Sequence, residues 1–137
     1  MKAAVAEALK ELAEGMPNAI VSHLEDDDGG AYVVVEPVDI GPSFEPRHTW
    51  AGFHVTYAYP EADVYPHFIS GNVKYIGAAD TPNKHADGDL PVPLSRGKMP
   101  GFERPAVQIS RRTKSPDGET YSALYKLRRV IDLLKRR

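Results

Sequence analysis

The sequence contains no cysteine. Without a thiol the chain can form no disulfide, offer no thiolate to a metal and use no cysteine as a nucleophile. The missing disulfides fit a reducing compartment, so we expect a cytoplasmic location. No apolar run approaches the ~20 residues that cross a membrane, and the first residues lack the apolar centre of a signal peptide. We therefore expect a soluble protein with no membrane contact.

The chain also lacks a strong excess of charge of either sign. Its 137 residues carry a net charge of −2, which gives no case for nucleic-acid binding. Apolar residues make up 42% and charged residues 26%, a globular balance that predicts one domain over residues 1–137. The charge is nevertheless uneven, because residues 111–137 hold nine basic and three acidic residues. This segment is either a solvated basic helix face or a docking surface for an acidic partner.

Common catalytic motifs are absent as well. The sequence has no Gly-x-Ser-x-Gly, no phosphate-binding loop ending in Gly-Lys-Ser/Thr and no His-Glu-x-x-His. Two of the five histidines, His54 and His67, fall on neighbouring predicted strands, which makes them weak candidates for a facing pair of metal ligands. Two ligands do not make a site, and imidazoles on the wetter face of a sheet are the simpler interpretation. We expect no cofactor.

Hydrophobic periodicity predicts an α+β fold. Apolar residues at helical spacing indicate an N-terminal helix and a longer C-terminal helix, and alternating residues indicate four strands between them. The predicted helices cover residues 2–15 and about 117–135, the strands cover 19–24, 32–38, 49–59 and 64–69, and residues 106–110 form a short extended piece. Short links between consecutive strands predict a four-stranded antiparallel meander with the helices on one face. Residues 77–104 are predicted to be irregular, and so long a segment is often functional.

This order of elements, together with two short motifs, resembles the ubiquitin-conjugating (UBC) superfamily, which includes inactive and RWD-like members. The motifs are Tyr59-Pro60 at the end of the third predicted strand and the proline-containing strand over residues 64–69. In active members a His-Pro-Asn tripeptide precedes the nucleophilic cysteine. Here Gly71-Asn72 is the nearest remnant, and residues 102–107 lie where the cysteine is expected. The resemblance also implies truncation after the second main helix, because the two further helices of the family do not follow.

The resemblance implies a non-catalytic module that binds protein. Its partner would be a ubiquitin-like modifier, the activating enzyme or an active conjugating enzyme. The candidate contacts lie on the first helix, in a proline-flanked loop and on the last helix: Lys10, Pro42, Phe44, Pro46, Arg128 and Arg129. Of these we favour Phe44, predicted to be an exposed hot spot, because aromatic side chains dominate interface energetics. The alternative is a small metal- or ligand-binding enzyme that uses histidines and the 77–104 segment.

Overall fold

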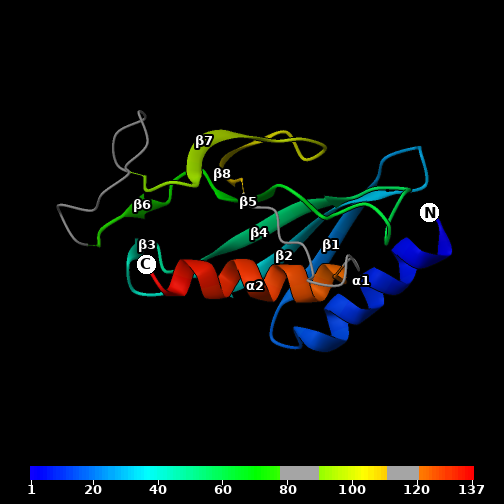
Figure 1. Cartoon of the computed structure of the whole chain (residues 1–137), viewed down its shortest axis with the longest axis horizontal. Coiled ribbons are helices and arrows are strands. Elements are labelled where there is room, and N and C mark those ends of the chain that lie inside the picture. The colour runs from blue at the N-terminus through cyan, green and yellow to red at the C-terminus, as the bar shows by residue number, and fades with distance from the viewer. Residues whose placement is uncertain (78–89, 111–120) are drawn as a thin grey trace.

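The computed structural model of the chain describes residues 1–77, 90–110 and 121–137. Two helices lie on one side of a sheet (Figure 1). The helices are α1 (Ala3–Gly15) and α2 (Ala123–Lys135). The strands are β1 (Ile20–Glu25), β2 (Ala31–Asp39), β3 (Phe44–Glu45), β4 (His48–Val55), β5 (His67–Ser70), β6 (Lys74–Tyr75), β7 (Leu94–Met99) and β8 (Arg104–Ile109).

The main sheet has six antiparallel strands in the order β1-β2-β4-β5-β8-β7, and β3 pairs with β6 in a separate two-stranded ladder. The α+β class, the terminal helices and the antiparallel sheet are as predicted, but the predicted number of four strands is wrong. β7 was missed, and β8 was predicted only as a short extended piece over residues 106–110. The two strands form a hairpin that extends the sheet beyond β5. Four consecutive residues of β7, 95–98, are polar or glycine, so this edge strand carries no apolar alternation for a sequence pattern to detect.

The core lies between the helices and one face of the sheet. Alternate residues of the central strands point into it, as the period of two along a strand requires. On the helix side, the buried side chains repeat at helical spacing. The main contributors are Val5 and Leu12 of α1, Val33 and Val35 of β2, Phe53 and Val55 of β4, and Leu127 and Leu134 of α2. The predicted packing of the C-terminal helix across one face is therefore confirmed.

The first residues of the predicted C-terminal helix, from Asp117, lie outside the described part of the chain. Within it, α2 begins at Ala123, after the N-cap residue Ser122. The Ser122 side chain accepts a hydrogen bond from the backbone N–H of Tyr125, which satisfies one of the unpaired donors at a helix N-terminus. Residues 121 and 122 are not helical, so within the described residues the helix starts later than predicted.

A smaller apolar cluster covers the opposite face of the sheet. Its buried members are Val34, Trp50, Phe68, Met99 and Ala106. The turn of the β7–β8 hairpin folds over this face, where Gly101 lies against the ring of Tyr32 in β2. The Arg104 guanidinium lies 5.0 Å from the centre of the Trp50 ring and 5.2 Å from that of Phe102. The hairpin thus supplies a cover for this face, in place of a helix.

Candidate functional site

A groove opens where the end of α1, a bend in β2 and the outer face of α2 meet. Its volume is about 370 Å³. A second hollow of about 220 Å³ adjoins it and shares Met16 and Pro37 as lining residues. Apolar side chains form much of the wall, namely Met16, Pro37, Val38 and Ile131, while Asp39, Arg128, Asp132 and Lys135 supply the charged groups. The site therefore combines apolar surface with charge, as protein interfaces do.

The bend in β2 follows from an irregularity in its pairing with β4. Val35 lies opposite Ala51 and Val38 lies opposite Thr49, so two residues of β2 face one residue of β4. One extra residue on one strand makes a β-bulge, which bends the strand locally. Pro37 falls within this bulge, where its missing N–H removes no ladder hydrogen bond. The exposed Pro37 ring consequently turns toward the groove, which it lines.

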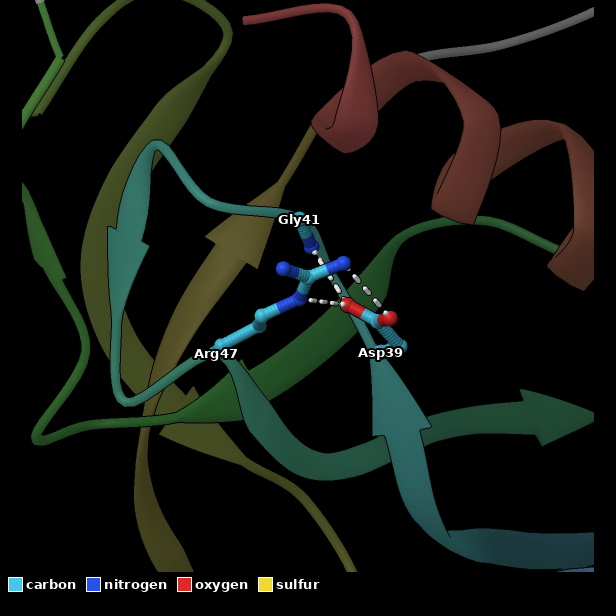
Figure 2. A network of polar contacts seen from close by, with 3 residues as sticks. All are labelled: Asp39, Gly41 and Arg47. Carbon is cyan, nitrogen blue, oxygen red and sulfur yellow. Dashed lines mark hydrogen bonds and ion pairs between the residues drawn. The ribbon is translucent and has the colours of Figure 1, made fainter.

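The Asp39 carboxylate on the groove is held by its own loop (Figure 2). Asp39 Oδ1 accepts hydrogen bonds from Arg47 Nε at 2.8 Å and from the Gly41 backbone N–H at 2.9 Å, and Oδ2 accepts from Arg47 Nη2 at 3.1 Å. Donation by Arg47, and secondly by Gly41, lowers the pKa of Asp39 to about 2. Asp39 is therefore anionic at neutral pH, but Arg47 balances its charge, which reduces its repulsion of an acidic partner.

Arg128, one of the predicted contacts, lies on the groove and joins the two helices. Its Nη2 atom donates to the carbonyl oxygen of Gly15, the last residue of α1, at 3.1 Å. That acceptor is neutral, so this bond does not cancel the positive charge of Arg128. Arg129 is not among the residues that line the groove, and its guanidinium lies 5.9 Å from the centre of the Tyr125 ring. Both arginines are exposed, as are Lys135 and Arg136 further along α2.

The prediction that Phe44 is exposed is wrong. Its side chain is 2% exposed and packs against the Tyr75 ring, with the ring centres 5.4 Å apart. The Asp39–Arg47 ion pair closes the loop, and the pairing of β3 with β6 turns Phe44 back into the core. The flanking residues differ, since Pro42 is exposed and Pro46 is half-buried. A short sequence between two prolines gave no sign of this long-range pairing.

Lys10 occupies an exposed position on α1. It is not among the residues that line the groove, which lies at the C-terminal end of the same helix. The predicted contacts on the two helices therefore do not converge on one site: Arg128 lies at the groove and Lys10 lies apart from it.

The prediction that His54 and His67 face one another is also wrong. His67 lies directly opposite Phe53, so the next residue, His54, points to the other face of the sheet. His54 stacks on Tyr32 with ring centres 4.1 Å apart, and its Nε2 atom lies 2.6 Å from Asp26 Oδ2. His67 is fully buried beside Phe53. Among the residues that the structure describes, no three histidines, aspartates or glutamates cluster as metal ligands.

Sequence reasoning missed a polar cluster beneath α2. Lys126 is 1% exposed, and its Nζ atom lies 2.7 Å from Oδ1 of Asp63. Within residues 1–77, 90–110 and 121–137, neither ring nitrogen of His67 has a hydrogen-bond partner. Burial, and secondly the positive charge of Lys126, lowers the pKa of His67 to about 3, so the ring is neutral at neutral pH. The available signal was that Lys126 interrupts the buried apolar stripe of α2 formed by Ala123, Leu127 and Val130.

Comparisons with protein-family models, curated proteins and solved structures found no match. Neither helix in the described residues is long and apolar enough to span a membrane.

The 77–104 segment, which the alternative hypothesis used as a site, is only partly described. Residues 78–89 lie outside the described part of the chain. Residues 94–99 form β7, and residue 104 begins β8, so the later part is strand and turn rather than one irregular loop. This part of the segment belongs to the sheet and covers its outer face.

Proposed function

We propose that this chain is a non-catalytic protein-binding module of a ubiquitin-like conjugation system, and that an acidic surface of its partner docks on the groove beside α2. The observation that carries the proposal is the open groove itself, in which apolar walls adjoin the basic face of a helix. A protein of the conjugation system would place an apolar side chain between Pro37 and Ile131 and acidic side chains near Arg128.

The apolar and the charged residues of the groove would contribute to binding in different ways. Apolar contacts that exclude water supply most of the binding energy, whereas exposed charges chiefly set the rate of association and the choice of partner. Met16, Pro37 and Ile131 provide the apolar surface. Exposed Arg128, Arg129, Lys135 and Arg136 give this side of α2 a positive field, against the single carboxylate of Asp132 within the helix.

The assignment to a conjugation system rests on the UBC resemblance. Two segments that the resemblance relates to the active site lie side by side, because the Gly71 N–H donates to the carbonyl oxygen of Pro105 at 3.2 Å. No cysteine is present to form the thioester of an active conjugating enzyme. A serine hydroxyl is a far weaker nucleophile unless a base activates it. These features support a relative that binds members of the system without carrying the modifier.

The proposal can be tested with purified proteins. The ubiquitin-like modifier, the activating enzyme and a conjugating enzyme from one system would each be titrated into the chain by calorimetry. At least one should bind, and Ile131→Ala should weaken its affinity about tenfold or more through loss of apolar contact. Arg128→Glu should slow association and reduce its dependence on salt. Lys74→Glu, an exposed charge reversal on β6 outside the groove, serves as the control.

Melting curves would establish that each variant remains folded. If none of the three proteins binds, the functional assignment fails. If one binds with an affinity and rate that neither groove variant alters, the partner uses another surface and the groove is not the site.

A further inference from the structure

The two edge strands of the main sheet differ in how they are protected. At one edge, β7 presents Arg96 and Lys98, and exposed charges of this kind discourage pairing with another strand. At the other edge, β1 contains no lysine, arginine or proline. Its residues are exposed except for half-buried Val21, and they include Ile20 at 74% exposure and Leu24 at 45%. An exposed edge strand that carries two exposed apolar side chains is a template for a further strand.

The hydrogen-bond pattern shows which backbone groups of β1 are available. The Asp26 N–H donates to the carbonyl oxygen of Gly30, which continues the register of the β1–β2 ladder by one pair. Because bonded and non-bonded pairs alternate in an antiparallel ladder, Ile20, Ser22 and Leu24 bond to β2. The N–H and C=O groups of the alternate residues, Val21 and His23, point away from β2 toward the open edge.

We propose that β1 pairs with β1 of a second copy of this chain, antiparallel, about a two-fold axis at Ser22. In this register Ile20 lies opposite Leu24 of the second copy, and Leu24 lies opposite its Ile20. The two most exposed apolar side chains of the strand then cover one another twice, and Val21 exchanges backbone hydrogen bonds with His23 of the second copy.

The neighbouring registers that keep the same backbone pattern are less favourable. A shift by two residues in one direction places Ile20 opposite Asp26, and a shift in the other places Leu24 opposite Asn18. Each of these registers places Ile20 and Leu24 opposite polar residues, so their contact with one another is lost. The second register leaves only half-buried Val21 opposite its own counterpart. The sequence of β1 is therefore self-complementary in one register.

Charge supports a second copy as the occupant. The same register brings Asp26, where the acidic turn over residues 26–28 begins, toward Asn18 of the second copy, two residues before its β1. Gly15 lies close by in the sequence, and its carbonyl oxygen accepts a hydrogen bond from the Arg128 guanidinium, which brings that positive charge to this end of α1. By the two-fold symmetry, the approach of the acidic turn to this end of α1 in the second copy occurs twice. It extends the interface beyond the paired strands, which alone would bury less than the roughly 1,000 Å² that a stable interface should exceed. The dimer should accordingly weaken as salt is raised.

The absence of cysteine permits a direct test of the register. Ser22→Cys introduces the sole thiol of the chain at the axis, in a non-hydrogen-bonded pair whose Cα atoms lie about 4.5 Å apart, within the range of a disulfide. Mild oxidation should convert this variant to a covalent dimer. His23→Cys is the matched control, because its counterpart across the dyad is Val21 and its thiol has only a diagonal neighbour. Equal cross-linking of the two variants, or none with Ser22→Cys, would overturn the register and the proposal with it.

Sedimentation of the unmodified chain, without any other protein, should show a monomer–dimer equilibrium. His23→Pro removes an N–H that points outward, so it should weaken the dimer tenfold or more and leave the β1–β2 ladder intact. Leu24→Lys should also weaken the dimer, because a lysine on an edge strand discourages pairing. It provides the test if the proline variant does not fold. Ile76→Lys, at a residue 55% exposed outside the sheet edge, is the control. The pairing would be refuted if the chain stayed monomeric up to its solubility limit, or if both β1 variants still formed the dimer. Either result is independent of whether a protein of the conjugation system binds the groove.

Discussion

The Nζ atom of Lys126 lies 2.7 Å from the Oδ1 atom of Asp63, although Lys126 projects from α2 among apolar core residues. The lysine side chain is 1% exposed and the aspartate 28% exposed, so the pair lies at the edge of the core. Removing an ammonium group from water is unfavourable unless an opposite charge and hydrogen bonds offset the loss. Asp63 thus ties α2 to the connection between β4 and β5.

We expect Asp63→Ala to lower the free energy of unfolding by about 1–3 kcal/mol, because it removes the ion pair between Asp63 and the buried Lys126 ammonium group. The effect should be smaller than the roughly 3–5 kcal/mol for a fully buried pair, since water reaches Asp63. Adding Lys126→Met should restore part of the loss by replacing the buried ammonium group with an apolar side chain of similar size. Urea denaturation of both variants would measure these changes, and a double variant no more stable than Asp63→Ala would show that the pair is not the cause.

Protonation of His67 should make the fold sensitive to mild acid. Its folded-state pKa, lowered to about 3, lies below the unfolded value of about 6.5. Between these values the unfolded chain binds a proton that the folded chain excludes. Stability should therefore fall as pH decreases from about 6.5 toward 3, by as much as about 1.4 kcal/mol per pH unit from this group.

The test is the slope of unfolding free energy against pH over that interval. His67→Leu should flatten the slope, because the group that takes up the proton is gone. His48→Leu, at an exposed histidine, should leave it nearly unchanged. Equal slopes in the unmodified chain and in His67→Leu would assign the acid sensitivity to other groups.

Features that arise within a single helix or strand could be predicted from the sequence, whereas contacts between distant segments could not. Alternation along β4 and the apolar stripe of α2 arise within single elements, so their buried faces could be predicted before the structure was known. The burial of Phe44 depends on β6, some thirty residues later in the chain. The groove depends on three separate segments, and of the six predicted contact residues Arg128 alone lines it. Periodicity within an element carries no information about such contacts.

Phe44 provides the sharpest contrast between the prediction from sequence and the structure. Phe44 is a fully buried aromatic residue, so Phe44→Ala should lower the free energy of unfolding by about 3–5 kcal/mol. Tyr57→Ala, at an aromatic residue 57% exposed, should change it by about 0.5 kcal/mol or less. Denaturant titrations of the two variants would compare them directly. If Phe44→Ala left the melting temperature unchanged, Phe44 would not be a core residue.

The fold of the β7–β8 hairpin over the outer sheet face should depend on Gly101. Its φ angle is +84°, and a Cβ atom there would overlap Cγ of the Tyr32 ring. We therefore expect Gly101→Ala to lower the free energy of unfolding by about 1–3 kcal/mol, because the backbone is strained and the hairpin must withdraw. Gly97→Ala in β7 is the matched control, since its nearest neighbouring atom would be 3.5 Å away, an ordinary contact.

Trp50, the sole tryptophan, reports on the same hairpin because it lies under Arg104 in the outer cluster. Withdrawal of the hairpin in Gly101→Ala should expose the indole and shift its fluorescence emission to longer wavelength, whereas Gly97→Ala should keep the original spectrum. Because alanine is the new residue in both variants, a difference between them isolates the backbone conformation and close packing at Gly101 from any general effect of replacing glycine. Matching spectra and matching stabilities would mean that the hairpin covers Trp50 without the close contact to Tyr32.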